Sequence, residues 1–207
     1  MIAIKNIIFD LGGVIINLDY QRTRKAFHTL GIAEFDRIFT QTKQTGFFDA
    51  FDKGLIAPDQ FREEVRKHIP QTVSDAQIDA AWDAMLLDVP QENLNVLSNL
   101  KSRYRTFLLS NTNEIHVKNF SAYLKQTYGT PDFGPYFERW YYSCRIGKRK
   151  PDAEAFRLVL EENGLIPEET LFIDDTTMHL EGAKKLGIRV EHFTNTTLPE
   201  FAERMKL

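Results

Sequence analysis

The chain has 207 residues, of which 43% are hydrophobic, so it is long enough to bury one sizeable core and to carry a smaller inserted unit. Its 26 basic and 29 acidic side chains nearly cancel to a formal net charge of −3 and are spread along the sequence. This pattern excludes an extended basic surface for nucleic acid or for an anionic membrane. Cys144 is the only cysteine, which excludes an internal disulfide and favours a reducing, cytoplasmic location.

Residues 1–10 form an apolar N-terminal run that Lys5 interrupts and Asp10 ends. The run is too short to span a membrane and has no small-residue cleavage pattern, so we expect neither an anchor nor a secretion signal there. Its composition is typical of a buried β-strand.

Five short runs of apolar, β-branched or aromatic residues have the length of strands. They occupy residues 6–9, 106–109, 140–143, 170–173 and 189–193. Stretches with helical spacing separate the last four runs, and Gly164 and Gly187 indicate where two of these helices end. The helices in question are expected at residues 154–163 and 179–186. This alternation predicts a Rossmann-like α/β fold in which a parallel sheet has helices on both faces.

Residues 20–89 depart from the alternation, because they contain amphipathic helical segments and no convincing strand. Pro58 and Ser74 are typical of helix starts, and Gly31 and Pro70 of helix ends. The expected helices cover residues 22–30, 34–42, 58–68 and 74–86. We therefore predict a helical-bundle cap at residues 20–89, inserted after the first strand into an α/β core made of residues 1–19 and 90–207.

Polar residues gather where the first four predicted strands end. In open α/β sheets, ligands bind outside the carboxyl ends of the strands. The segments that follow these strands are, in order, Asp10-Leu11-Gly12-Gly13, Ser110-Asn111-Thr112-Asn113, Lys148-Arg149-Lys150-Pro151 and Asp174-Asp175. Four strands are thus expected to bring carboxylates, a hydroxyl and an ammonium group to one edge of the sheet.

This set of groups suits phosphoryl transfer. Clustered carboxylates attract Mg²⁺, which takes one or two protein carboxylates plus waters and substrate oxygens, and Asp10 and Asp175 are candidate ligands. Once the metal neutralises the phosphate, an aspartate oxygen can attack phosphorus and form an aspartyl-phosphate that water hydrolyses. A serine hydroxyl, backbone amides and a lysine ammonium would stabilise the charge on the transferred group.

The same segments resemble, in order and spacing, the four motifs of the haloacid dehalogenase superfamily. The resemblance covers nearly the whole chain, and residues 20–89 fall where that family places a small helical cap. Within the superfamily, Asp-Leu-Gly and Ser-Asn-Thr-Asn are similar to the α-D-glucose 1-phosphate phosphatase type rather than to the chloride-removing enzymes. The matching segments are Phe9-Asp10-Leu11-Gly12-Gly13-Val14, Leu109-Ser110-Asn111-Thr112, Lys150-Pro151, and Phe172-Ile173-Asp174-Asp175 with Glu181-Gly182-Ala183.

The resemblance implies a role for each matched residue. Asp10 would be the nucleophile and a ligand of Mg²⁺, with the carbonyl group of Gly12 as a second ligand. Asp175 would bind the metal directly, and Asp174 would bind it through water or orient the site. Lys150 would neutralise the nucleophile and the phosphate. The phosphoryl oxygens of a small-molecule phosphate ester would be bound by Ser110 and Asn111.

Gly12 departs from the family pattern. Most phosphatases of the family have a second aspartate two residues after the nucleophile, where it protonates the leaving group and later activates water. Removing such a group typically slows a reaction on the order of 10²- to 10⁴-fold. Three explanations compete for the glycine at position 12. Water or another side chain takes the place of the second aspartate, the substrate has a leaving group that needs little protonation, or the activity of the protein is weakened. His179, four residues after Asp175, is a candidate acid or base, although histidines at helix starts more often only form hydrogen bonds.

Each candidate residue also has a purely structural interpretation. Asp10 could open a turn, Asp174-Asp175 could cap a helix, Ser110-Asn111 could form a turn, and Lys150 could be a solvated surface residue. Adjacent carboxylates repel each other without a cation, and this repulsion favours the metal site.

Two other functions compete with a Mg²⁺-dependent phosphatase. A dehalogenase would use the aspartate nucleophile without metal, but paired carboxylates would repel its anionic substrate. A phosphate-binding or regulatory protein would retain the fold and lack turnover because of Gly12. The sequence leaves the identity of the substrate and the oligomeric state open.

Overall fold

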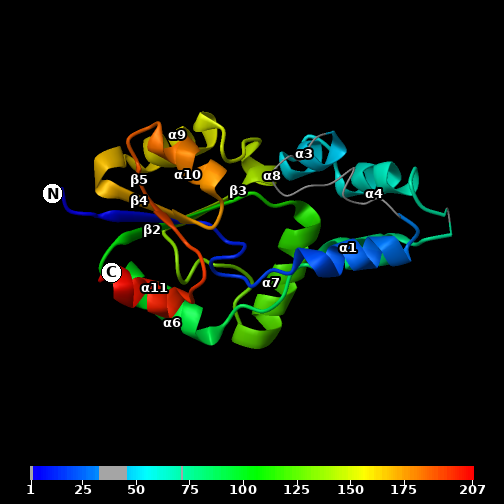
Figure 1. The fold of residues 1–207 in the computed structure, drawn as a ribbon, viewed down its shortest axis with the longest axis horizontal. Coiled ribbons are helices and arrows are strands. Elements are labelled where there is room, and N and C mark those ends of the chain that lie inside the picture. The colour runs from blue at the N-terminus through cyan, green and yellow to red at the C-terminus, as the bar shows by residue number, and fades with distance from the viewer. Residues whose placement is uncertain (1, 33–45, 71) are drawn as a thin grey trace.

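The computed structural model describes residues 2–32, 46–70 and 72–207. Within these ranges the core is a sheet of five parallel strands with helices on both sides (Figure 1). The strands are β1 (Asn6–Phe9), β2 (Arg105–Ser110), β3 (Arg139–Tyr142), β4 (Thr170–Asp174) and β5 (Arg189–His192).

The strand order across the sheet is β3-β2-β1-β4-β5. The chain moves outward from β1 to β3 and then crosses to the other side of β1, so the order reverses between β1 and β4. Phe9 pairs with Leu108 of β2 and with Ile173 of β4, which brings the carboxyl ends of the three strands to the same level. A crevice at such a reversal is where open α/β sheets bind ligands.

Alternate residues of the central strands point to opposite faces of the sheet, as strand geometry requires. Ile8, Phe107 and Phe172 pack with α9 (Ala153–Asn163) and α10 (Thr177–Lys184) on one face. Ile7, Phe9 and Leu108 face the other layer, which contains the following helices: α6 (Gln91–Lys101), α7 (Glu114–Tyr128) and α11 (Leu198–Met205). Two hydrophobic layers therefore cover the sheet.

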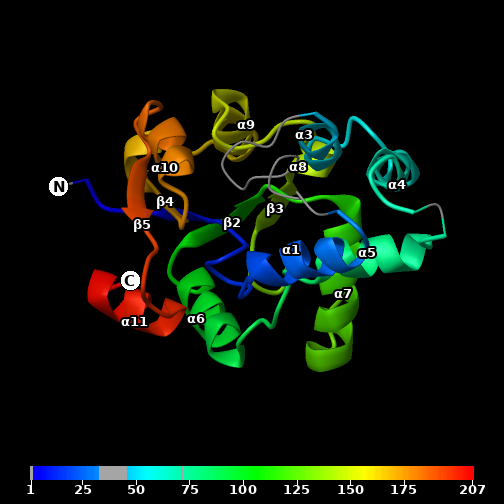
Figure 2. The same cartoon turned by 45° about the vertical axis from the view of Figure 1, so that its right-hand side comes forward.

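A separate hydrophobic cluster joins helices from residues 20–89 and contacts Ile115 of α7. Its centre is aromatic, with the rings of Phe48, Phe61 and Trp82 at centroid distances of 5.3 to 5.6 Å. In Figures 1 and 2 this group lies beyond the carboxyl ends of the strands, on the side away from the N-terminus. Its helices are α1 (Tyr20–Thr29), α3 (Phe47–Asp52), α4 (Pro58–Arg66) and α5 (Asp75–Asp83).

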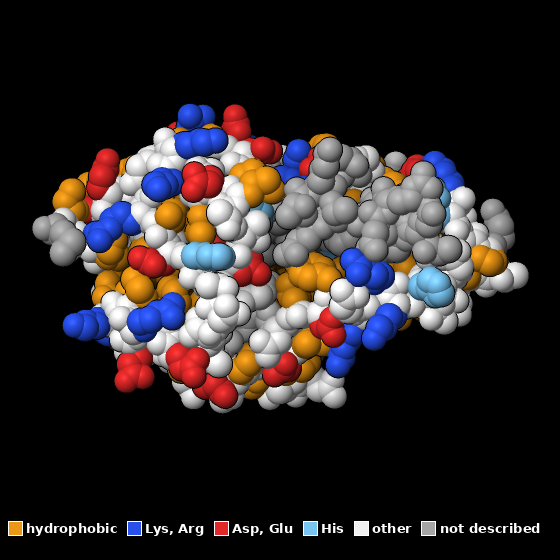
Figure 3. Space-filling view, in the orientation of Figure 1, with side chains coloured by type: hydrophobic (Ala, Val, Ile, Leu, Met, Phe, Trp, Pro, Cys, Tyr) orange, Lys and Arg blue, Asp and Glu red, His pale blue; other side chains and the backbone are white. Residues whose placement is uncertain are grey.

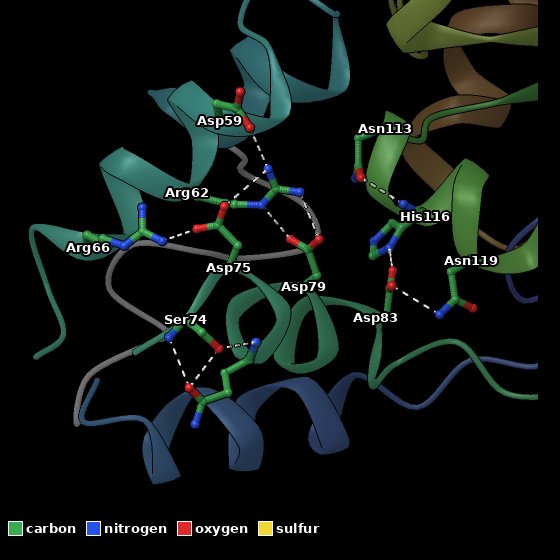
Figure 4. A network of polar contacts seen from close by, with 11 residues as sticks. Asp59, Arg62, Arg66, Ser74, Asp75, Asp79, Asp83, Asn113, His116 and Asn119 are labelled. Carbon is green, nitrogen blue, oxygen red and sulfur yellow. Dashed lines mark hydrogen bonds and ion pairs between the residues drawn. The ribbon is translucent and has the colours of Figure 1, made fainter. Parts of the chain in front are cut away.

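Ion pairs hold α4 against α5 (Figure 4). The guanidinium of Arg62 lies 2.8 Å from both carboxylate oxygens of Asp79 and 2.6 Å from Asp59. Arg66 forms a further pair with Asp75. The pairs of Arg62 with Asp79 and of Arg66 with Asp75 connect the two helices, whereas Asp59 belongs to α4 itself.

The predicted strands agree closely with the observed ones, and residues 6–9 agree at both ends. Pro58 is the first residue of α4, and Ser74 caps α5 by accepting a hydrogen bond from the backbone of Gln77. Gly164 ends α9 as predicted. The helix predicted at residues 34–42 lies outside the described residues. The short helices α8 (Ser143–Ile146) and η1 (Pro167–Glu169) complete the description.

No helix in the described part of the chain has the length and apolarity that crossing a membrane requires. Acidic and basic side chains are interspersed over the face shown in Figure 3.

Candidate active site

Asp10 follows β1 directly and is buried, with 7% of its surface exposed. Its backbone N–H still bonds to the sheet, donating to the carbonyl of Ile173 at 2.9 Å. Its carboxylate Oδ1 accepts a hydrogen bond from the N–H of Leu11 at 2.7 Å and lies 2.7 Å from Nζ of Lys150. Strand pairing therefore fixes the backbone of Asp10 while two donors hold its side chain.

Lys150 is completely buried, and its ammonium group bridges two carboxylates. Nζ lies 2.7 Å from Asp10 Oδ1 and 2.7 Å from Asp174 Oδ2. The amide of Asn111 holds the backbone of Lys150 on both sides, since Oδ1 accepts from its N–H at 2.9 Å and Nδ2 donates to its carbonyl at 2.8 Å. The segment after β2 thus positions a lysine from the segment after β3.

Asp174 and Asp175 occupy the end of β4 and lead into α10. Asp174 is fully buried, and its Oδ1 accepts from the N–H of Thr176 at 2.7 Å. The hydroxyl of Thr176 donates to Asp175 Oδ1 at 3.0 Å. The two carboxylates are therefore held by the turn itself and point into the crevice from different directions, one toward Lys150 and the other toward Gly13.

The Gly12-Gly13 turn brings backbone next to the Asp175 carboxylate. Gly13 has a φ of +75°, and a Cβ there would lie 2.3 Å from Asp175 Oδ2, so the close approach requires glycine. Gly12 is different, because a Cβ there would meet only the end of the Leu18 side chain, at 2.7 Å. Leu18 fills the space into which a side chain at position 12 would extend.

Ser110 is the last residue of β2, is buried, and lines a pocket together with Asn111 and Gly12. The Asn111 side chain is already engaged by the backbone of Lys150. The Asn111 amide therefore links the segment after β2 to the backbone of Lys150.

The charges of the site are unbalanced. In the described part of the chain, the carboxylates of Asp10, Asp174 and Asp175 share the single ammonium of Lys150. Burial and the neighbouring Asp174 raise the pKa of Asp10 well above its usual value, although Lys150 acts in the opposite direction. Burial and Asp174 also raise the pKa of Asp175. Burial alone would raise the pKa of Asp174, but Lys150 and His179 lower it below its usual value.

This donor set fits a hard dication. Burial and the neighbouring carboxylate disfavour the ionised forms of Asp10 and Asp175, so a cation beside them would be stabilised, and carboxylates are ligands that Mg²⁺ prefers. Ligand atoms of Asp10, Asp174 and His179 also lie within 4.8 Å of one another. Nζ of Lys150 contacts the first two of these, at 2.7 Å from each.

His179, in the first turn of α10, is part of the site. Its Nδ1 lies 3.1 Å from both carboxylate oxygens of Asp174, and its Nε2 lies 3.5 Å from Nδ2 of Asn111. The ring thereby connects the segments that follow β2 and β4. Burial lowers the pKa of His179 below its usual value.

The structure brings together every residue singled out for the site. Asp10, Lys150, Asp174 and His179 are linked by direct contacts, and Asp175 and Ser110 lie at the same edge. Sequence reasoning missed Asp52 and His116, which line the pocket beside Ser110. Neither residue belongs to a recognisable motif. Asp52 follows a stripe of apolar residues in a helix, and His116 lies on a helix whose bounds the sequence pattern does not predict.

Fold and site together are those of an α/β hydrolase. Residues 4–187 match the family model described as haloacid dehalogenase-like hydrolase, and the chain belongs to that family. The D-ribitol-5-phosphate phosphatase of Bacteroides thetaiotaomicron is 32% identical over 184 residues, or 89% of each chain.

Solved structures give the same result. A haloacid dehalogenase family enzyme from Bacteroides thetaiotaomicron, in complex with magnesium and inorganic phosphate, is 37% identical with a TM-score of 0.84. The match covers 96% of this chain and 99% of that one. A haloacid dehalogenase-like hydrolase from Porphyromonas gingivalis is 29% identical with a TM-score of 0.87, over 99% and 98% of the two chains.

Proposed function

We propose that this protein is a Mg²⁺-dependent phosphatase that hydrolyses a small phosphorylated metabolite through an aspartyl-phosphate on Asp10. The observation that carries the proposal is the buried ammonium of Lys150, 2.7 Å from both Asp10 and Asp174. Beside it, Asp175 packs onto the Gly12-Gly13 turn. The named activity of the Bacteroides relative and the magnesium and phosphate bound by the solved neighbour support the same conclusion.

In this proposal, a carboxylate oxygen of Asp10 attacks phosphorus while the bond from phosphorus to the alcohol oxygen breaks. Water then hydrolyses the aspartyl-phosphate, which releases inorganic phosphate and restores the Asp10 carboxylate. Lys150 stays charged, because Asp10 and Asp174 raise its pKa against the lowering effect of burial, and it balances the charge of the nucleophile. Mg²⁺ would be held by Asp10, the Gly12 carbonyl and Asp175, with Asp174 assisting. When bound, the metal neutralises the phosphate charge that would otherwise repel the carboxylates.

The phosphoryl oxygens would be bound by Ser110 and by the segment containing Asn111. Removing one such donor typically lowers kcat on the order of 10²- to 10³-fold. Position 12 carries no proton donor, so the departing alkoxide of the alcohol would take its proton from water or from another group of the site.

Residues 20–89 are proposed to act as the cap, and residues 1–19 and 90–207 as the hydrolase core. The aromatic cluster of the helices from residues 20–89 is distinct from the two layers on the sheet, which supports the division. The proposed substrate is a sugar phosphate or sugar-alcohol phosphate, as for the Bacteroides relative. The similarity to the glucose 1-phosphate type stays a prediction, as does a cytoplasmic location.

The test is phosphate release from p-nitrophenyl phosphate, D-ribitol 5-phosphate and α-D-glucose 1-phosphate, with Mg²⁺ or with a chelator. We expect release that depends on Mg²⁺ and that Asp10→Asn lowers on the order of 10⁴-fold or more, as for loss of other nucleophiles. Asp59→Asn, which alters an exposed carboxylate outside the site, is the matched control.

Two outcomes would refute the proposal. Halide release from a haloacid without metal would identify a dehalogenase instead. An absence of release from every ester, with phosphate still bound, would identify a phosphate-binding protein without turnover.

A further inference from the structure

A pocket of about 80 Å³ opens beside the proposed phosphate site. Gly12 and Ser110 line it on the side of the sheet, and Tyr20 lines it on the side of residues 20–89. Leu18 also belongs to the wall and takes the space beside Gly12, where a Cβ would lie 2.7 Å from the end of the leucine side chain. The leaving oxygen of an ester whose phosphate lies at Ser110 would therefore face this pocket.

Tyr20 is the first residue of α1, and the backbone on both sides of it is fixed. Directly before it, Asp19 caps the helix, and the N–H of Asp19 donates to the carbonyl of Met85 at 2.9 Å. In the first turn of α1, the hydroxyl of Thr23 donates to the carbonyl of Trp82 at 3.1 Å. These contacts hold the start of the helix against α5 and the segment that follows it, so the Tyr20 ring has a fixed place in the pocket wall.

The hydroxyl group of Tyr20 lies near the carboxylates of the site. Burial raises the pKa of this phenol, and the charges of Asp175 and Asp10 raise it further. Charges act in this way only at short range, because their interaction weakens with distance and is screened by solvent. Within the residues that the structure describes, no hydrogen bond engages the Tyr20 hydroxyl. Its proton is therefore retained at neutral pH and is available to a ligand in the pocket.

Two other side chains of the wall that carry hydrogen-bond donors are engaged elsewhere. The amide of Asn111 donates to the carbonyl of Lys150 at 2.8 Å, and an amide does not give up a proton at neutral pH. His116 has its Nδ1 2.8 Å from a carboxylate oxygen of Asp83, which places the imidazole hydrogen on Nδ1 and leaves Nε2 as an acceptor. Tyr20 is therefore better suited than either to protonate a leaving oxygen.

On the basis of the proposed phosphatase activity, we propose that Tyr20 protonates the leaving oxygen and so takes the role that Gly12 cannot fill. While a carboxylate oxygen of Asp10 bonds to phosphorus, the bond from phosphorus to the alcohol oxygen breaks. The electron pair of that bond takes the phenolic proton, which gives the free alcohol and a Tyr20 phenolate. The transfer is favourable because a phenol, with an ordinary pKa of about 10, is a stronger acid than an alcohol, which resembles water at about 15.7.

The proton returns to Tyr20 in the second half of the reaction. Water takes the place that the alcohol has left, since attacking and leaving oxygens both lie opposite Asp10 across phosphorus. This water attacks the aspartyl-phosphate and gives a proton to the phenolate, which yields inorganic phosphate, the Asp10 carboxylate and the phenol. The charges of Asp10 and Asp175 favour this return, because they destabilise a phenolate beside them. One ester and one water are consumed for each alcohol and phosphate formed.

The test compares two esters that differ in the basicity of the leaving oxygen. One is the aliphatic ester that the wild-type protein hydrolyses fastest, whose alkoxide needs a proton, and the other is p-nitrophenyl phosphate, whose leaving group needs little protonation. In Tyr20→Phe with Mg²⁺, we expect the ratio of kcat/KM for the aliphatic ester to kcat/KM for p-nitrophenyl phosphate to fall about 10- to 100-fold. Because kcat/KM reports the steps up to departure of the alcohol, the return of the proton does not enter this ratio.

Two further variants control the result. Tyr104→Phe removes a phenolic hydroxyl from a half-buried residue that packs on the sheet layer, outside the pocket, and should keep the wild-type ratio. Tyr20→His keeps a ring with an N–H donor and should recover part of the ratio that Tyr20→Phe loses. Thermal unfolding checks that each variant folds. We expect Tyr20→Phe to fold, because it removes one hydroxyl that has no hydrogen-bond partner among the described residues.

The possible failures are separable. An unchanged ratio in Tyr20→Phe, or an equal loss of kcat/KM for both esters, would overturn this inference and leave the phosphatase function in place. A Tyr20→Phe variant that does not fold would show that the hydroxyl has a structural role, and would also overturn the inference. So would a wild-type protein that hydrolyses p-nitrophenyl phosphate and no aliphatic ester. A wild-type protein that hydrolyses no phosphate ester at all would overturn the proposed function and this inference with it.

Discussion

Lys150 illustrates, for a single residue, how a buried charge is maintained. Its ammonium group has no exposed surface and survives burial because two carboxylates lie at 2.7 Å and because Asn111 holds its backbone. Removing a charge from water is expensive, and the geometry of the partners must compensate for it. Lys150 is thus a structural cation of the site as well as a candidate catalytic group.

We predict that Lys150→Met lowers the free energy of unfolding by about 3 kcal/mol in the absence of metal, because Asp10 and Asp174 lose their buried counter-charge. Adding Asp174→Asn to this variant should restore part of the loss. Urea unfolding in the presence of a chelator measures both effects. The control is Lys148→Met, from the same basic segment, which should change stability by less than about 1 kcal/mol. Equal stability of the Lys150 and Lys148 variants would contradict the assignment.

α3 is the element that joins the helices of residues 20–89 to the catalytic edge. Asp49, near its start, lies 2.8 Å from Nη1 of Arg149, directly before Lys150, and 3.1 Å from Nζ of Lys53. At its other end, Asp52 bonds to Asn113, three residues after Ser110. The short helix therefore contacts the segments that follow both β2 and β3.

We predict that Asp49→Asn and Arg149→Gln each raise KM for the preferred ester about two- to fivefold, since partly buried ion pairs contribute about 1 kcal/mol. The double variant should be no worse than either single one, because both remove the same contact. Steady-state kinetics at low and high salt provide the measurement. Lys5→Gln, which breaks an exposed pair with Glu169 away from the site, is the control. Additive effects of the two substitutions would show that the residues act independently.

On the scale of the whole molecule, the fold gathers several carboxylates at the edge of the sheet where the strands end. β1 and β4 are adjacent in the sheet, and the reversal of strand order between them brings Asp10 and Asp175 to the same edge, beside the helices of residues 20–89. The fold thus holds carboxylates together that would repel each other without a cation. Metal binding and stability of the fold should be linked for this reason.

We predict that Mg²⁺ at about ten times its Kd stabilises the protein by about 1.4 kcal/mol. For a chain of this size, the corresponding rise in Tm is about 4 °C. Thermal unfolding across a Mg²⁺ titration measures it. Asp175→Asn should abolish the rise, whereas Glu203→Gln, exposed on α11, should retain it. A rise of equal size in the Asp175 variant would place the metal elsewhere.

The predictable part of this protein is the part that depends on local sequence. β1 and α9 were predictable because a buried parallel strand needs a continuous apolar run, and because Gly164 takes the left-handed conformation in which helices end. The edge at which Asp10, Ser110 and Asp175 gather followed from the rule that parallel strands end on the same side. The pairing of Asn111 with the backbone of Lys150 did not follow from any local pattern.

The sequence by itself determined the strands, the segments that carry chemistry and the family resemblance, because period-two and period-3.6 patterns and short motifs are local properties of the chain. Only the tertiary structure decided that Leu18 occupies the space beside Gly12, and that Asp52 and His116 share a pocket with Ser110. Asp52 and Asn113 are 61 positions apart and make contact through helix packing. Such contacts depend on how elements pack in three dimensions, which the sequence pattern of neither element records.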